Sequence, residues 1–254
     1  MKQKIYAIIM AAALLVSLAS CGNAGGDADQ FSSSGRSPQD SSVRLESPVS
    51  LEGKKIETVQ TLAEPFSTYS EFSKFQTETD SVVRGVVTDI EYFAREKNAF
   101  TKMDLDISES ILGDFVNGDK ISVYKWGGYI PLSVSNPDIQ ERFPEITDEE
   151  LENTVVDMRI DGDPHPVVGQ DIVVFLTAVN PENGMYSIVG GHYGQFTNNG
   201  TDQFVRHLEL AKDSDGIADY SLTNQPEIDR SQMSGTNRAF TFAQLKAEVL
   251  EALS

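Results

Sequence analysis

Alternation of apolar and polar residues predicts several β-strands in the middle of the chain. Residues 100–112 alternate apolar with charged side chains, which is typical of a strand with one buried face. Residues 81–93 are rich in Val, Ile and aromatic residues and predict a second strand, in which Gly85 indicates a bulge or a close backbone approach. Residues 120–126 predict a third strand that ends at a pair of glycines.

The second half of the chain continues this β pattern. Residues 171–179 contain an almost uninterrupted apolar run, which predicts a strand buried on both faces. Asn183-Gly184 supplies turn chemistry, so we expect a hairpin to residues 185–189. A weaker hairpin is predicted over residues 195–205, around Asn199-Gly200.

Two helices are predicted at the ends of this β region. An aromatic residue recurs every three positions before the first strand, which predicts a short helix with an aromatic core face: Phe66, Tyr69, Phe72 and Phe75. Near the C-terminus, Thr241 and Gln244 form a capping-box pattern ahead of a helix. Its apolar face carries Leu245, Val249 and Leu253 and should dock against the sheet.

Residues 129–168 interrupt the strands. They hold five of the ten prolines, and residues 138–163 contain ten acidic side chains against two basic ones. Thr147 and Glu150 form a second capping-box pattern, with acidic residues in the first turn of a short helix. We interpret residues 129–168 as an insertion that lies over the sheet and carries a solvated acidic face.

The N-terminus has the features of a secretory signal peptide. Lys2 and Lys4 are followed by a 15-residue apolar run, residues 5–19, which is shorter than the roughly 20 residues of a membrane-spanning helix. A basic start, a short apolar stretch and small residues before a cleavage site predict a signal peptide over residues 1–20.

Leu18-Ala19-Ser20-Cys21 resembles the lipobox of bacterial lipoproteins. The resemblance implies cleavage before Cys21, a diacylglyceryl group on its thiol, and acylation of the new amine by a fatty acid such as palmitate. Two or three acyl chains attach a protein stably to a membrane. We therefore expect a lipid anchor in the bacterial cell membrane or outer membrane, with the protein facing the exterior or the periplasm. The alternative is an ordinary secreted protein whose cysteine is unmodified.

Composition then divides the rest of the chain. Residues 22–50 contain eight Ser and four Gly with a single aromatic residue, so we expect residues 21–50 to be the lipidated cysteine and a flexible tether. From residue 51 the composition shifts toward aromatic and β-branched residues. Residues 51–254 are predicted to form one folded, β-rich domain.

Charge and cysteine content exclude several function classes. The formal net charge is −19, and removal of residues 1–20 takes away two lysines and makes it −21. Such a charge argues against a nucleic-acid partner, because binding to nucleic acid depends on Lys and Arg that neutralise phosphates. Cys21 is the only cysteine, so an internal disulfide and a multi-cysteine metal site are excluded. No cofactor is predicted.

Several short motifs lie between residues 80 and 196, about half of the mature chain: Val83-Arg84-Gly85-Val86-Val87, Leu112-Gly113, Gly127-Gly128, Gly169-Gln170, Phe175-Leu176 and Gly190-Gly191-His192-Tyr193-Gly194-Gln195-Phe196. In these motifs the folded part resembles small OB-like antiparallel barrels and, more narrowly, uncharacterised bacterial secreted and surface domains. The resemblance implies a small OB-like antiparallel barrel, and the acidic insertion is a departure from it. Together with the helix patterns above, the predicted fold is mainly β (α+β), an OB-like barrel with an acidic helical insertion and a C-terminal helix. The resemblance implies no activity and no catalytic residue.

Candidate chemistry is sparse. The chain lacks the G-x-S-x-G, phosphate-loop and H-E-x-x-H motifs. Its histidines are His165, His192 and His207, whose wide spacing leaves open a shared metal site or separate hydrogen-bonded side chains. Asp213-Ser214-Asp215-Gly216 is similar to the start of a calcium loop but lacks the distant Glu, so an ordinary turn is the alternative.

Aromatic residues beside glycine-rich turns form the candidate binding face. Trp126 and Tyr129 flank Gly127-Gly128, and His192 and Tyr193 lie in a second glycine-rich loop. If both loops open at one end of the barrel, these four side chains form a shallow platform for a sugar or peptide. The alternative is that Trp126 fills the barrel interior.

Three functions remain open on these observations. The leading hypothesis is a lipid-anchored, non-enzymatic module that binds an extracellular protein, peptide or glycan. The second is an extracytoplasmic hydrolase or metal-binding enzyme that uses carboxylates and histidines. The third is a scaffold or inhibitor that meets a secreted enzyme through the acidic insertion.

Overall fold

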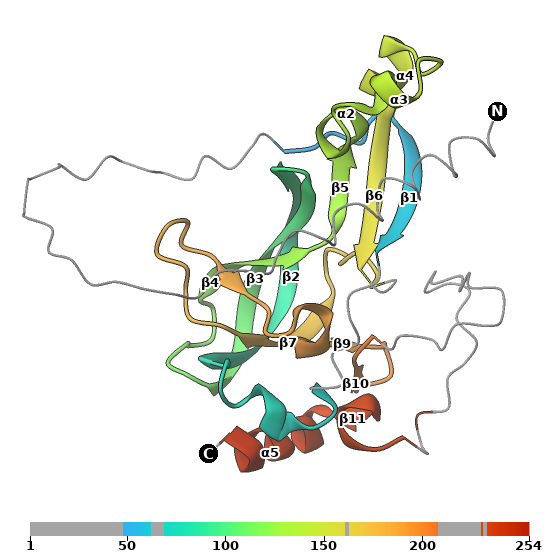
Figure 1. Cartoon of the computed structure of the whole chain (residues 1–254). Helices are drawn as coiled ribbons and strands as arrows, with labels where there is room; N and C mark the ends of the chain where they lie inside the picture. Colours follow the sequence, from blue (N-terminus) through green and yellow to red (C-terminus); the bar gives the residue numbers. More distant parts are fainter. Residues whose placement is uncertain (1–47, 62–68, 161–162, 208–229, 231–232, 254) are drawn as a thin grey trace, which may run out of the picture. The chain divides into compact units, whose positions relative to one another are not determined.

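A computed structural model describes residues 48–61, 69–160, 163–207, 230 and 233–253 (Figure 1). All of them fall within one compact unit, Leu45–Ser254. The predicted signal peptide, Cys21, nearly all of the predicted tether, Phe66 and the Asp213–Gly216 loop lie outside the described residues. Among the residues described, no helix is both long and apolar enough to cross a membrane.

The described fold is mainly β and contains two sheets. The larger has the order β11-β10-β9-β7-β2-β3-β4-β8 and curls around its own interior (Figure 1). Its strands are β2 (Ser81–Arg95), β3 (Asn98–Leu112), β4 (Lys120–Trp126), β7 (Asp171–Leu176), β8 (Tyr186–Ser187), β9 (Gln195–Asn198), β10 (Gln203–Val205) and β11 (Phe240–Thr241). The strands predicted over residues 81–93, 100–112, 120–126 and 171–179 are therefore confirmed, with small differences at their ends.

Bulges in β2 explain how a long strand can curl. The pairing of β2 with β3 shifts register at three places, one of them between Arg84 and Gly85. Bulges bend a strand and increase its twist. A Cβ atom added to Gly85 would lie 2.9 Å from the backbone oxygen of Asp106, so the close backbone approach expected at this glycine is confirmed.

The predicted hairpins differ in how regular they are. β9 and β10 pair antiparallel around residues 199–200, as predicted. The chain after β7 also turns back, but β8 pairs parallel with β4, and a single antiparallel bridge joins Leu176 to Ile188. The second arm of this predicted hairpin therefore pairs with β4 through β8 and with the end of β7 through the Leu176–Ile188 bridge.

The smaller sheet was not predicted. It has the order β1-β6-β5, where β1 (Lys55–Thr61) runs parallel to β6 (Thr154–Ile160) and β5 (Gly128–Pro131) runs antiparallel to it (Figure 1). Between β5 and β6 lie three short helices, α2 (Leu132–Ser135), α3 (Ile139–Arg142) and α4 (Asp148–Asn153). The interpretation of residues 129–168 as an insertion over the sheet is not confirmed, because much of this segment builds a sheet of its own.

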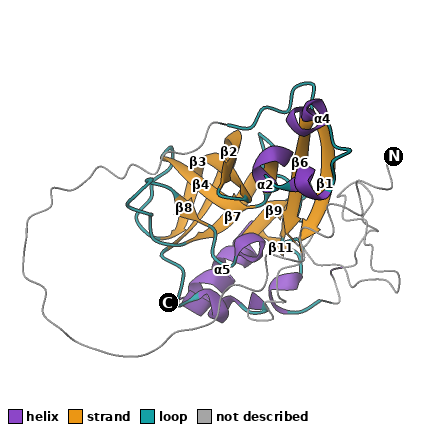
Figure 2. Cartoon of the chain, turned by 45° about the horizontal axis from the view of Figure 1, so that its top comes forward, coloured by secondary structure: helices purple, strands orange, loops and turns teal. Residues whose placement is uncertain are grey.

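Helix ends follow the sequence closely. The capping box at Thr147 and Glu150 is present at the start of α4. The second begins α5 (Phe242–Leu253), where the Thr241 backbone N–H donates to Gln244 and the Gln244 backbone N–H donates to Thr241. Helix α5 packs against β10, β11 and η2 (Phe72–Phe75), a single 3-10 turn at the predicted aromatic helix (Figure 2).

The two faces of the large sheet bury separate clusters. On one face the predicted aromatic core residues Tyr69, Phe72 and Phe75 pack with α5 and with β7. On the other, inside the curl, Met103, Leu105 and other aliphatic residues pack together. Strand β7 contributes alternate residues to both clusters, which confirms that its apolar run is buried on both faces.

Candidate functional site

A cavity of about 260 Å³ lies where the segment after β6 meets β9 and the end of β10. We call it the histidine cavity. Its walls are mostly polar or charged: Asp163, Pro164, His165, Gln170, His192, Gln195, Thr197, Asn198, Asn199, Val205, Arg206, His207 and Arg230. Ligand sites are typically concave and carry a few polar groups that converge on the ligand, and this cavity fits that description.

All three histidines of the chain border this cavity. The rings of His192 and His207 lie 5.6 Å apart, centre to centre, and meet edge to face. Within the described part of the chain, however, no three His, Cys, Asp or Glu side chains are grouped so that they could hold a metal ion. The three histidines therefore lie around one cavity, but among the described residues they do not form a set of metal ligands.

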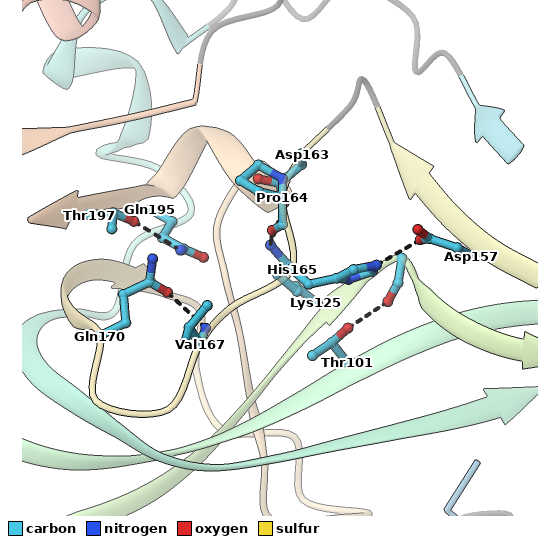
Figure 3. Close-up of polar contacts among 11 residues, drawn as sticks. Thr101, Lys125, Asp157, Asp163, Pro164, His165, Val167, Gln170, Gln195 and Thr197 are labelled. Carbon is cyan, nitrogen blue, oxygen red and sulfur yellow. Dashed lines mark hydrogen bonds and ion pairs between the residues drawn. The ribbon is translucent and has the colours of Figure 1, made fainter. Parts of the chain in front are cut away.

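A buried ion pair supports one wall of the cavity, to which it contributes Asp163. Lys125 reaches from β4 and donates hydrogen bonds to the Asp163 carboxylate and, at 3.3 Å, to the backbone oxygen of Pro164 (Figure 3). The two side chains are only 4% and 10% exposed. Burial opposes the charge of Asp163, but the attraction of Lys125 and of the nearby histidines outweighs it and holds the pKa of Asp163 below its ordinary value. The Asp163 carboxylate is therefore ionised at neutral pH.

His165 is held by a second buried carboxylate. Its Nε2 lies 2.7 Å from Oδ1 of Asp157 in β6, whose other oxygen accepts a 3.0 Å hydrogen bond from Arg159 (Figure 3). Burial raises the pKa of Asp157, but the hydrogen bonds and charges of His165 and Arg159 outweigh this effect. The pKa of Asp157 is therefore below its ordinary value, and the carboxylate is charged. Tyr129 packs on the His165 ring at 4.6 Å between ring centres. These contacts fix the orientation of the imidazole.

His192 is electrically neutral at physiological pH. The side chain is 6% exposed, and burial lowers its pKa to about 4, with Lys125, Arg206 and His207 acting in the same direction and Asp163 opposing them. The left-handed Gly190, at φ 62°, precedes the 3-10 turn η3 (Gly191–Gly194) that carries His192. A Cβ atom at Gly190 would lie 2.7 Å from the Tyr69 ring, so this turn requires glycine.

Side-chain amides supply much of the remaining wall. Gln195 donates from Nε2 to the Thr197 hydroxyl at 3.3 Å, while its Oε1 is buried with no hydrogen-bond donor among the described residues. Gln170 accepts a hydrogen bond from the Val167 backbone N–H at 3.3 Å (Figure 3). Amide and hydroxyl groups of this kind can donate to or accept from a polar ligand.

The four residues predicted to form an aromatic platform lie in different surroundings. His192 borders the cavity, and Tyr193 is buried behind it at 4.1 Å between ring centres. Tyr129 is next to the cavity through its contact with His165. Trp126 is 54% exposed and packs on Phe100, so it does not fill the barrel interior. No recorded contact among the described residues joins Trp126 to the other three.

Several charged residues of the site were not predicted from the sequence: Asp163, Arg206 and Arg230 in the cavity walls, and Lys125 and Asp157, which pair with wall residues. One of them leaves a signal in the strand pattern. Lys125 follows Ile121 and Val123 at two-residue spacing, so this charged residue lies on the face of β4 that the alternation predicts to be buried. The other four have no comparable local signal, because their partners are distant in the sequence or lie in irregular segments.

No protein-family description matches the chain, and no curated protein matches it.

Proposed function

We propose that this chain is a lipid-anchored extracytoplasmic protein that binds a small polar ligand in the histidine cavity. The observation that carries the proposal is the cavity itself, into which a strongly acidic protein gathers three histidines, two arginines and several amides. Its volume of about 260 Å³ suits a ligand the size of a monosaccharide or amino acid, below the range of about 300–1,000 Å³ for drug-sized ligands.

The location part of the proposal rests on the first 21 residues. A basic start, a short apolar run and Cys21 after two small residues are what a lipoprotein signal requires, and the chain has no second cysteine. A binding module tethered at a membrane surface needs a spacer, and the Ser- and Gly-rich residues 22–50 are suited to that role.

Replacement of Cys21 by Ser should abolish lipidation. Intact-mass spectrometry of the wild-type protein is expected to show the loss of residues 1–20 and the gain of acyl chains. Because the serine hydroxyl does not replace the thiol in this modification, C21S should keep the full-length mass and carry no lipid. S20A, which keeps a small residue before the cysteine, should be processed like the wild type. Acyl-free wild-type protein would refute the anchor.

We also propose that the curled sheet is an OB-like barrel. Strands β7, β2, β3, β4 and β8 follow one another in the sheet, and the Leu176–Ile188 bridge links the chain after β8 back to β7. Four of these strands pair antiparallel, and β8 pairs parallel with β4. Five strands in a partly open barrel are the architecture of OB folds, whose loops and sheet face commonly bind oligosaccharides or oligonucleotides.

A binding screen tests the proposed function. The full-length protein in detergent micelles is titrated with neutral sugars, sugar acids, amino acids and peptidoglycan fragments, and thermal unfolding reports binding because a ligand of the native state raises the unfolding temperature. We expect at least one class to stabilise the protein. Absence of any effect, together with a protein that co-purifies, would favour a protein-binding role instead.

A second candidate, hydrolysis, is favoured by the Asp157–His165 pair. A buried carboxylate that holds one imidazole nitrogen leaves Nδ1 of His165 as a candidate general base toward water. If the cavity hydrolyses its ligand, H165Q should lower the turnover rate by about 10²–10⁴-fold while the ligand still binds. R95Q changes an exposed arginine outside the cavity walls, leaves the Asp157–His165 pair and the cavity intact, and serves as the control. Equal turnover by H165Q and wild type would exclude this role.

A further inference from the structure

Arg230 gives the histidine cavity a positive charge that the described protein does not neutralise. The side chain is half-buried in the cavity wall, and its recorded hydrogen bond is a 3.1 Å donation from Nη1 to the backbone oxygen of Asn237. No carboxylate of the described residues pairs with it. Burial lowers the pKa of Arg230, and no anion among the described residues raises it. A guanidinium stays protonated in proteins, so this half-buried charge favours an anion from solution.

The charged groups around the cavity favour an anion of low charge. Arg206, the other guanidinium of the walls, donates hydrogen bonds to the Tyr69 backbone oxygen and to the Asn237 side chain. Asp163 is neutralised by Lys125 behind the wall, and His192 is neutral at physiological pH because burial lowers its pKa to about 4. The Asp163 carboxylate also stands in the same wall and would repel additional negative charge. A carboxylate forms two parallel hydrogen bonds with one guanidinium, so Arg230 suits a carboxylate group of the ligand.

Gln195 indicates that the ligand also carries a hydrogen-bond donor. The residue is 9% exposed, and its Oε1 has no donor among the described residues although it lies in the cavity wall. A buried carbonyl oxygen without a donor is costly, and a ligand hydroxyl would satisfy it. Neighbouring Thr197, Asn198 and Asn199 add further polar groups around the same part of the cavity.

We infer that the histidine cavity binds a small hydroxylated monocarboxylate, a sugar acid in size and chemistry, with its carboxylate on Arg230 and a hydroxyl on Gln195. The inference rests on the proposed binding function and adds the class of ligand. It assigns Arg230 the selection of acidic over neutral ligands, and Gln195 the preference for hydroxylated ones.

Glucuronate and glucose are matched probes, because they differ only in a carboxylate against a hydroxymethyl group. Isothermal titration calorimetry of the full-length protein in detergent should show that glucuronate binds about tenfold or more tightly than glucose, the factor expected for a charged hydrogen bond. R230Q should weaken glucuronate binding by about the same tenfold factor, so that glucuronate and glucose bind equally. R230K, which keeps the charge, should retain part of it. Gluconate, galacturonate and N-acetylmuramate extend the acidic panel.

R95Q removes an equal charge from an exposed arginine at the end of β2, outside the cavity walls, and should bind like the wild type. Equal binding of glucuronate and glucose would overturn the inference while leaving the proposed binding function intact. Tighter binding of inorganic phosphate than of glucuronate, or no binding of any acidic probe, would also overturn it. R230Q that melts at a lower temperature but binds glucuronate as well as the wild type would show that Arg230 serves stability instead.

Discussion

Replacement of Lys125 by methionine should destabilise the protein by about 3–5 kcal/mol, the cost of leaving a buried charge without its partner. The Asp163 carboxylate would lose the side chain that neutralises it in a wall that is almost closed to water. Equilibrium denaturation by urea, which gives the free energy of unfolding of K125M and wild type, measures this cost.

Two comparisons separate the ion pair from a general effect of losing a lysine. K125M/D163N removes both charges and should recover much of the lost stability. K246M breaks the exposed Lys246–Glu109 pair, whose side chains are 40% and 38% exposed, and should cost about 0–1 kcal/mol. Equal losses for K125M and K246M would show that the Lys125–Asp163 pair is not an important part of the structure.

Acidification should destabilise the protein through His192. The folded-state pKa of about 4 lies below the ordinary histidine value of 6.5, so between these pH values the unfolded chain binds a proton that the folded protein does not. The contribution of His192 to the free energy of unfolding is therefore fully present above pH 6.5 and is lost as the pH falls toward 4. The shift corresponds to about 3 kcal/mol over that range.

The H192Q variant isolates this contribution. Its free energy of unfolding, measured by urea denaturation between pH 7 and pH 4, should fall less steeply than that of the wild type because glutamine does not titrate. Asp163 and Asp157 lose their own contributions only at lower pH, since their folded-state pKa values are lowered below the ordinary value. Parallel pH profiles for H192Q and wild type would mean that His192 is not buried as a neutral side chain.

Local patterns predicted the elements whose partners are close in sequence. The alternation in β2, β3 and β4 and the two capping boxes depend on neighbouring residues, so they could be inferred directly. The small sheet could not, because β1 finds its partner β6 about a hundred residues later and β5 is only four residues long. Strand pairing over such distances leaves no local periodicity.

The candidate site shows the same division. The histidines stood out as the only three in the chain, and their convergence was one of two open alternatives. Asp157 and Asp163 were counted among the acidic residues of a solvated face, yet both side chains are buried and paired. Only the fold brings Lys125 from β4 to Asp163, so a composition argument could not distinguish these two carboxylates from their exposed neighbours.

Nuclear magnetic resonance provides the most direct test of the central claim, that ligand binds in the histidine cavity. The chain holds three histidines, all at the cavity, and one tryptophan, Trp126, that does not line it. On addition of glucuronate to the full-length protein in detergent, the imidazole signals of His165, His192 and His207 should shift while the Trp126 indole N–H stays in place. A shift of the indole signal with unchanged imidazoles would contradict this account and place the binding surface at the exposed aromatic residues.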